Sequence, residues 1–162
     1  MTPGEETVLV DLKVRPSWDL LTAVRRFVEN AFESYTPDGD LLCRLSLSAY
    51  ELMENAVKYA EGPFASLQLH VDPARGMAGM VLANDASLAH VAELRRSFSE
   101  IQAVADPFGY YCELMRRAAG RSGSKLGLGR IVAEAEMALS LEIEGSRVRI
   151  GAETPLTESV FR

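Results

Sequence analysis

The sequence predicts an α+β domain, a two-layer α/β sandwich whose mixed, mostly antiparallel sheet is covered by helices. One observation is that segments alternating between apolar and polar residues, typical of half-buried strands, recur along the chain. Another is that longer segments between them repeat apolar residues at three- and four-residue spacing, as amphipathic helices do. The order strand, helix, helix, strand, strand over the first half suits a single sheet covered by helices.

The elements of the N-terminal half follow from these two periods. Residues Thr7–Val14 alternate and predict a strand, whereas Trp18–Tyr35 has helical spacing. The next helix contains Ser46–Ala60, and Asp38 or Asp40 in the preceding turn can cap it. Both carboxylates stand in a Thr-Pro-Asp-Gly-Asp turn, so either can accept hydrogen bonds from the free N–H groups of the first helical turn.

The C-terminal half adds two hairpins with a helical region and a glycine-rich segment between them. We expect strands over 64–71, 77–83, 139–143 and 148–150, and helices over 88–104, 108–119 and 130–137. About ten residues at the C-terminus lack either period and are expected to form a tail. No internal repeat or linker separates these elements, so we expect one domain over residues 1–162 with its core over about 7–150.

Composition and charge exclude several classes of protein. Hydrophobic residues make up 48% of the chain and charged residues 25%, as in an ordinary soluble globular protein. The net charge of −6 argues against a nucleic-acid partner, because nucleic-acid binders usually carry a basic stripe. No apolar run approaches the roughly 20 residues of a membrane span, and no secretory signal is recognised, so we expect a cytoplasmic protein without membrane contact. Cys43 and Cys112 are isolated, which predicts two buried free thiols.

Glu51, Asn55 and Lys58 stand about one helical turn apart, so a carboxylate, an amide and an ammonium group project from one face of the predicted helix. A carboxylate four residues before an amide can serve a phosphate–metal centre. The amide offers an uncharged oxygen to Mg²⁺, and the carboxylate can orient or deprotonate a hydroxyl group. The same spacing also suits a solvated polar face of an amphipathic helix. Spacing alone leaves both interpretations open.

The segment Glu51-Leu-Met-Glu-Asn55-Ala-Val-Lys58-Tyr-Ala60 resembles the N-box of the histidine-kinase-like ATPases, the GHKL or Bergerat group. That box has the form Glu-x-x-x-Asn-Ala-x-[Lys/Arg/His]-[His/Tyr]-[Ala/Gly], and the chain matches nearly every position. The resemblance implies the Bergerat ATP-binding fold, with ATP and Mg²⁺ as cofactors. It also implies that Asn55 holds Mg²⁺, that Glu51 is the catalytic residue and that Lys58 belongs to the nucleotide site.

A glycine-rich stretch, Gly123-Ser-Lys-Leu-Gly127-Leu-Gly129, precedes the helix expected over 130–137. Such a loop can bind phosphate, because glycines let the backbone approach the anion and free N–H groups at the helix start point at it, although many such stretches are only flexible turns. It is neither a Walker A loop nor a dinucleotide fingerprint. It resembles the second glycine box of the same family. By that resemblance, the residues that would surround the triphosphate are Ser124, Lys125, Gly127, Leu128 and Gly129.

The first glycine box of the family, Asp-x-Gly-x-Gly at the end of a strand, corresponds in position to Asn84-Asp85-Ala86-Ser87. Either Asn84 or Asp85 could take the place of the adenine-binding Asp, and an Asn side chain can still accept a hydrogen bond through its carbonyl oxygen. No glycine is present here, so Ala86 or Ser87 narrows the pocket or requires a different backbone path. The expected nucleotide site is therefore degenerate at this box.

Within the family, the chain is most similar to small anti-sigma-factor serine kinases and related regulators of bacterial partner switching. The resemblance implies phosphoryl transfer from Mg-ATP to a Ser or Thr hydroxyl of a protein partner, a sigma factor or a STAS-type anti-anti-sigma-like substrate. It is compatible with a homodimer, and residues 88–124 would form a lid over the nucleotide. His70 and His90 lack the surroundings of a phosphoacceptor histidine, so histidine autophosphorylation is not expected.

Two other interpretations remain open. The degenerate first glycine box could have turned the same fold into a nucleotide-free protein-interaction module, although the intact pair of Glu51 and Asn55 argues against full decay. Alternatively, ATP hydrolysis could drive a conformational clamp, which predicts phosphate release without phosphorylation of a partner. Arg116, Arg117 and Arg121 in the lid could meet phosphates or an acidic partner, or form a solvated cluster.

Overall fold

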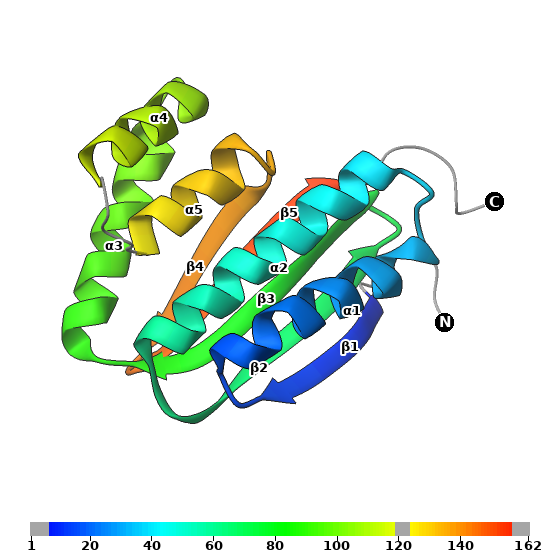
Figure 1. Cartoon of the computed structure of the whole chain (residues 1–162), viewed down its shortest axis with the longest axis horizontal. Helices are drawn as coiled ribbons and strands as arrows, with labels where there is room; N and C mark the ends of the chain where they lie inside the picture. The colour runs from blue at the N-terminus through cyan, green and yellow to red at the C-terminus, as the bar shows by residue number, and fades with distance from the viewer. Residues whose placement is uncertain (1–6, 119–123, 157–162) are drawn as a thin grey trace.

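The computed structural model describes residues 7–118 and 124–156 of the chain. It contains a five-stranded sheet in the order β1-β2-β3-β5-β4, in which each neighbouring pair of strands is antiparallel. Helices form a second layer on one face of this sheet (Figure 1). The predicted two-layer α+β sandwich is therefore confirmed, with antiparallel pairing throughout the described strands in place of a mixed sheet.

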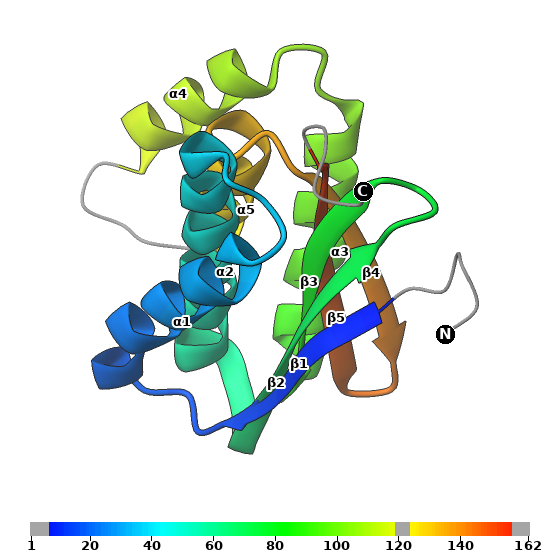
Figure 2. The same ribbon diagram turned by 90° about the vertical axis from the view of Figure 1, so that its right-hand side faces the viewer.

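The described elements alternate in blocks of helices and strands. The strands are β1 (Thr7–Val14), β2 (Ala60–Asp72), β3 (Met77–Ala86), β4 (Ala138–Glu144) and β5 (Arg147–Pro155). The α-helices are α1 (Leu21–Glu33), α2 (Gly39–Tyr59), α3 (Leu88–Ala103), α4 (Pro107–Arg117) and α5 (Ser124–Ala133), and a short 3-10 helix, η1 (Trp18–Leu20), precedes α1. Helices α1, α2 and α5 lie over the sheet, while α3 and α4 lie beyond its β4 edge (Figures 1 and 2).

The core lies between the sheet and its helices. Leu67 and Leu69 of β2 stand opposite Leu82 and Met80 of β3 in the antiparallel register, and all four side chains are buried. Because side chains alternate along a strand, this register directs one face of each strand toward the helices. The fully buried helical residues of the same cluster are Val28, Phe32, Leu41, Leu45, Ala49, Leu52, Met53, Leu128 and Ile131.

Helix α2, which carries the N-box segment, is fixed at both ends. Of the two candidate caps, the structure uses Asp38, whose side chain accepts hydrogen bonds from the N–H groups of Asp40 and Leu41. Lys58 in the last turn is favourably placed against the negative end of the helix dipole. The position of the N-box residues is therefore set by a cap at one end and by burial along the helix.

Strand β2 begins earlier than predicted, directly after α2, at Ala60 instead of residue 64. Its pairing with β3 shifts between Glu61 and Ser66, and Gly62 has a φ of +83°, which only glycine adopts easily. Residues 61–63, which lie between the expected helix and the expected strand, are thus an irregular part of the strand. Strand β5 also extends into the expected tail, because its last residues pair with the start of β3.

The glycine-rich segment differs most from expectation. Helix α5 begins at Ser124, so residues 124–129 are helical, and the loop expected over them is wrong. Glycine in a helix costs about 1 kcal/mol relative to alanine. Complete burial of Leu128 and Ile131 offsets this cost, since each buried side chain of that size contributes about 1.5–3 kcal/mol. Residues 119–123, with Arg121 and Gly123, lie outside the described residues.

Most of the segment predicted as a lid is helical. Ser87 caps α3, and Leu94 and Phe98 of that helix are buried in the hydrophobic core. The ring of His90 stacks on Tyr59 at the end of α2, with centroids 4.0 Å apart and an interplanar angle of 11°. Helix α3 is therefore part of the packed domain and is anchored to the N-box helix.

Two further findings concern composition. Both cysteines are free, but Cys43 is exposed and Cys112 half-buried, so the prediction of two buried thiols is wrong. They lie on α2 and α4 at positions that do not face the core. In the part of the chain that the structure describes, no helix has the length and apolar character needed to cross a membrane.

Candidate functional site

The carboxylate of Glu51 forms an ion pair with Arg130 across the contact between α2 and α5. Nη1 of Arg130 donates a hydrogen bond of 2.8 Å to Oε1 of Glu51. Nε of Arg130 donates a second hydrogen bond, also of 2.8 Å, to Oε2 of Glu134. The Glu51 side chain is 6% exposed and that of Arg130 is 38% exposed, so the guanidinium bridges a buried and a half-exposed carboxylate.

Burial controls the protonation of this pair. Desolvation raises the pKa of Glu51 above its ordinary value of 4.5, and the opposing effect of the Arg130 hydrogen bond does not cancel it. Burial by itself lowers the pKa of Arg130, but its hydrogen bonds to Glu134 and Glu51 outweigh this and raise it. Arg130 therefore stays charged, while Glu51 holds a proton more strongly than an exposed glutamate. A carboxylate with a raised pKa is a better general base.

Glycine at position 127 allows α5 to approach Glu51. A Cβ atom on Gly127 would lie 2.8 Å from Oε2 of Glu51, a distance that real Cβ contacts essentially never show. The backbone of the glycine-rich segment thus lies directly against the carboxylate of the N-box. Two predicted site residues, 76 positions apart in the sequence (127 − 51), are brought into one place.

Asn55 lies one turn after Glu51 and is 6% exposed. Its Nδ2 atom is buried and has no hydrogen-bond partner in the described structure. An unsatisfied buried amide costs about 1–3 kcal/mol, so this group fits a ligand that completes its hydrogen bonds. In the described residues, no cluster of three His, Cys, Asp or Glu side chains could hold a metal ion. Nδ2 is a hydrogen-bond donor, so it fits an acceptor such as a phosphate oxygen, whereas only Oδ1 of the same amide could take Mg²⁺.

A cleft of about 310 Å³ opens between α2 and α5 at Glu51. It contains three of the predicted site residues, Glu51, Lys58 and Gly127. Lys58 forms an ion pair with Glu54 at 3.4 Å. The other residues that line the cleft are Tyr50, Glu54, Tyr111, Leu126 and Arg130. The cleft therefore combines two carboxylates, two cations, aromatic rings and the backbone of Gly127.

Three other predicted residues of the glycine-rich segment, Lys125, Leu128 and Gly129, are not among those that line this cleft. Leu128 is completely buried in the core, and Gly129 faces Leu114 of α4. Lys125 pairs with Glu100 of α3, and that contact raises the pKa of Lys125. Ser124 is the first residue of α5. The structure thus gives the side chains of this segment mainly packing contacts and one surface ion pair.

Asn84 and Asp85, the two candidates for the adenine contact, point to opposite faces of the sheet. Asn84 is 7% exposed and lies on the same side as Leu82, toward the helices. Its Nδ2 donates a hydrogen bond of 2.9 Å to the backbone carbonyl of Asp85. The side chain of Asp85 is 51% exposed and lies 4.0 Å from Arg147. Only Asn84 can serve a ligand held beside α2.

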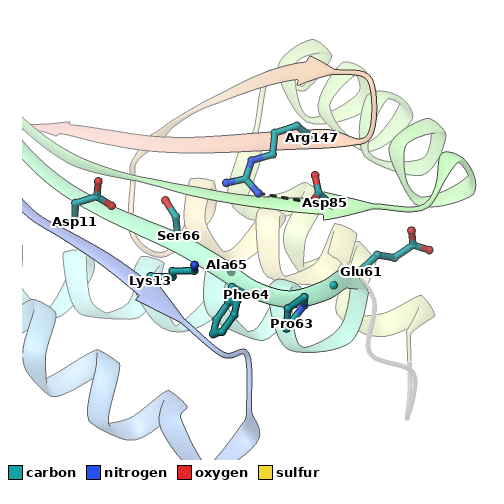
Figure 3. A pocket seen from close by; sticks show the side chains of 10 residues that line it. Asp11, Lys13, Glu61, Pro63, Phe64, Ala65, Ser66, Asp85 and Arg147 are labelled. Carbon is teal, nitrogen blue, oxygen red and sulfur yellow. Dashed lines mark ion pairs between the residues drawn. The ribbon is translucent and has the colours of Figure 1, made fainter.

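A larger hollow, of about 520 Å³, lies on the opposite face of the sheet (Figure 3). Of the predicted site residues it contains only Asp85. Its charged side chains are of both signs: Asp11, Lys13, Glu61, Asp85 and Arg147. In Figure 3, Arg147 and Asp85 point toward each other, so part of this charge is already paired. We place the candidate site in the smaller cleft, because the buried carboxylate and the unsatisfied amide belong to α2.

Sequence reasoning missed Arg130 and Tyr111 as parts of the site. Arg130 follows Gly127 by three residues and precedes Glu134 by four, so all three share one helical face. This signal was hidden because the segment before Arg130 was predicted as a loop. Arg116 and Arg117, expected to meet phosphates or a partner, pair with Glu113 on their own helix.

No protein-family model and no curated protein sequence matches the chain. Its fold is similar to that of a solved structure, a chain of the SiaB–SiaC complex from Pseudomonas aeruginosa, with a TM-score of 0.66. The match covers 90% of this chain and 89% of that chain at 15% sequence identity. This likeness establishes a shared fold: the chain has the architecture of a subunit of that two-protein complex.

Proposed function

We propose that this chain is an ATP-binding regulatory protein that phosphorylates a Ser or Thr hydroxyl of a partner protein. The observation that carries the proposal is Glu51, a buried carboxylate with a raised pKa that opens onto a cleft beside glycine backbone. Perturbed pKa values cluster at catalytic sites, and a carboxylate whose pKa is raised by burial suits a general base. The N-box resemblance on the same helix gives the same assignment.

Each residue has a distinct role in this proposal. Glu51 accepts the proton of the attacking hydroxyl group while the hydroxyl oxygen forms a bond to the γ-phosphorus. The bond between the γ-phosphorus and the β,γ-bridging oxygen breaks, and ADP leaves with its electron pair. Lys58 and the backbone around Gly127 bind the triphosphate, and Asn84 faces the adenine. Positioning and charge stabilisation supply most of the rate in such transfers. Asp85 has no role here, because it lies on the other face of the sheet.

Asn55 holds Mg²⁺ through its side-chain oxygen in this proposal, while its unpartnered Nδ2 hydrogen-bonds to the nucleotide. When bound there, the ion would neutralise phosphate charge, and Asn55 would be its neutral protein ligand.

The partner is a protein. The solved structure that shares this fold is a complex of two proteins, which supports a regulator that acts by binding another chain. By family resemblance we propose a sigma factor or a STAS-type substrate, in the cytoplasm, as part of a partner-switching system.

The test is calorimetric titration of Mg-ATP into wild type and Asn55→Ala. We expect saturable binding by the wild type that weakens about tenfold or more in the variant, as when a buried polar contact to a charged ligand is lost. Asn30→Ala, an exposed change on α1, is the matched control and should bind like wild type. Absence of wild-type binding at millimolar Mg-ATP would overturn the proposal. Steady ADP release without a partner would favour the clamp over the kinase.

A second candidate function is a nucleotide-free docking module. It is favoured by the observation that Arg130 already neutralises Glu51 and that residues 124–129 form a packed helix, not a phosphate loop. This function predicts no heat of binding for Mg-ATP with either the wild type or the Asn55 variant. The same titration therefore separates the two candidates.

A further inference from the structure

Arg130 stands at the centre of the candidate site, although it lies outside the N-box and the glycine positions. Its guanidinium uses Nη1 for Glu51 and Nε for Glu134, and its side chain is 38% exposed at the wall of the cleft. A guanidinium is a planar fork of donors whose geometry matches two oxygens of a phosphate as well as those of a carboxylate. Arg130 therefore presents a phosphate-binding group where a triphosphate would enter.

The observed ion pair conflicts with the chemistry assigned to Glu51. A general base must be within hydrogen-bond reach of the proton that it accepts. Arg130 now occupies Oε1 of that carboxylate at 2.8 Å, and the backbone of Gly127 crowds Oε2. A partner hydroxyl can reach Glu51 only after the guanidinium moves. The structure therefore shows a resting arrangement of the proposed site.

Glu134 makes such a movement feasible. It lies four residues after Arg130, just past the end of α5, its side chain is 36% exposed, and it holds Nε independently of Glu51. A guanidinium that leaves Glu51 therefore keeps one charged partner. Loss of the Glu51 contact costs less when the cation is half-exposed and still paired.

We propose that Arg130 is a phosphate-binding residue of this site, held by Glu51 before ATP binds and transferred to the γ-phosphate when it binds. This inference rests on the proposed function. The exchange links two events, because the γ-phosphate that supplies the phosphoryl group also releases the carboxylate that accepts the proton. ADP lacks the γ-phosphate and leaves Glu51 paired. The site therefore distinguishes ATP from ADP before any partner binds.

The test measures the dissociation constants of Mg-ATP and Mg-ADP by calorimetry. The variants are Arg130→Ala, Arg130→Lys, Glu51→Gln and the double variant Glu51→Gln/Arg130→Ala. Arg149→Ala is the matched control, because Arg149 is also half-exposed and paired with a glutamate, Glu142, but in the sheet. Thermal unfolding of each variant identifies any that fails to fold. Arg130→Lys retains a positive charge at this position and replaces Arg130→Ala in the binding measurements if the alanine variant is unfolded.

We expect Arg130→Ala to weaken Mg-ATP binding about tenfold and Mg-ADP binding much less, since a charge-assisted contact to the γ-phosphate is lost. Arg130→Lys should restore part of the preference for ATP, and Arg149→Ala should behave like wild type. Glu51→Gln should tighten ATP binding several-fold, because the guanidinium no longer has to leave a carboxylate. That gain should shrink in the Arg130→Ala background.

The outcomes separate this inference from the function on which it rests. If wild type binds no Mg-ATP, the proposed function fails and this inference fails with it. If wild type binds Mg-ATP but Arg130→Ala keeps the wild-type ATP-to-ADP affinity ratio, only the role of Arg130 is overturned. Equal effects of Glu51→Gln with and without Arg130 would also overturn it, because simple charge repulsion by Glu51 would then explain the gain.

Discussion

Gly127 and Glu51 are in direct contact: Oε2 of the glutamate lies 2.8 Å from the place that a Cβ atom of residue 127 would occupy. The backbone of α5 at Gly127 packs against the carboxylate of Glu51 on α2 and leaves no room for a side chain at position 127. This contact, with the Arg130 ion pair on the other carboxylate oxygen, fixes α5 against the N-box helix. One added methyl group should disturb it.

Gly127→Ala should lower the free energy of unfolding by about 1 kcal/mol. Alanine gains about 1 kcal/mol of helix propensity, and overpacking against a buried, ion-paired carboxylate costs about 1–3 kcal/mol. Urea denaturation measures the difference. Gly39→Ala is the control, because no atom lies within 4 Å of the added group and the residue begins α2. In a Glu51→Ala background the change should become stabilising; a loss of stability there as well would contradict the contact.

Glu51→Gln should reduce the loss of stability that accompanies a rise in pH. Burial raises the folded-state pKa of Glu51 above 4.5, so the folded chain binds this proton more tightly than the unfolded chain. The free energy of unfolding therefore falls as the pH rises from 4.5 through the raised pKa. At pH 8 the variant should be more stable by about 1 kcal/mol, the usual size of a single buried change, because Arg130 keeps Glu134.

Denaturation of both proteins between pH 4 and 8 tests this expectation. Glu142→Gln is the control, since that side chain is 76% exposed and also pairs with an arginine. If the free energy of unfolding of Glu51→Gln runs parallel to that of the wild type over the whole pH range, ionisation of the buried carboxylate does not destabilise the fold.

His90→Phe should remove a loss of stability at acidic pH. Burial lowers the pKa of His90 below 6.5, against the opposing effect of Glu93, which lies 3.7 Å away. The unfolded chain then binds this proton more tightly, so stability falls as the pH drops from 6.5 through the lowered pKa. Phenylalanine keeps the ring stack on Tyr59 without a titrating group. Unfolding at pH 7 and pH 5 should show a smaller difference in the variant; an unchanged difference would assign the acid sensitivity to other groups.

Asp38→Ala should destabilise the fold by about 1 kcal/mol, because two N–H groups of the first turn of α2 lose their acceptor. The effect is global, since α2 packs in the middle of the core. Asp19→Ala, an exposed change on η1, is the control and should leave the urea midpoint within error. Equal midpoints for the two variants would show that the cap does not contribute.

Local sequence patterns predicted the elements whose contacts are local. Strand β1 has the bounds that alternation gave it, Thr7–Val14, and α2 lies where its apolar spacing and Asp38 place it. The C-terminal hairpin, with its turn at residues 145–146, was also predictable, because the turn and the two alternating strands that it joins lie within one short segment of the chain. The pair of Glu51 and Asn55 on one helical face also followed from spacing alone.

The sequence by itself determined the fold class, the capped helix α2 and the face that carries Glu51 and Asn55, because period and capping act within a few residues. Only the tertiary structure decided that residues 124–129 are helical, since burial of Leu128 against distant elements outweighs the local preference of glycine for turns. It also decided that Arg130 pairs with Glu51, 79 residues away, and that Asp85 faces the other side of the sheet. These contacts depend on packing between elements, which the spacing of residues within one segment does not determine.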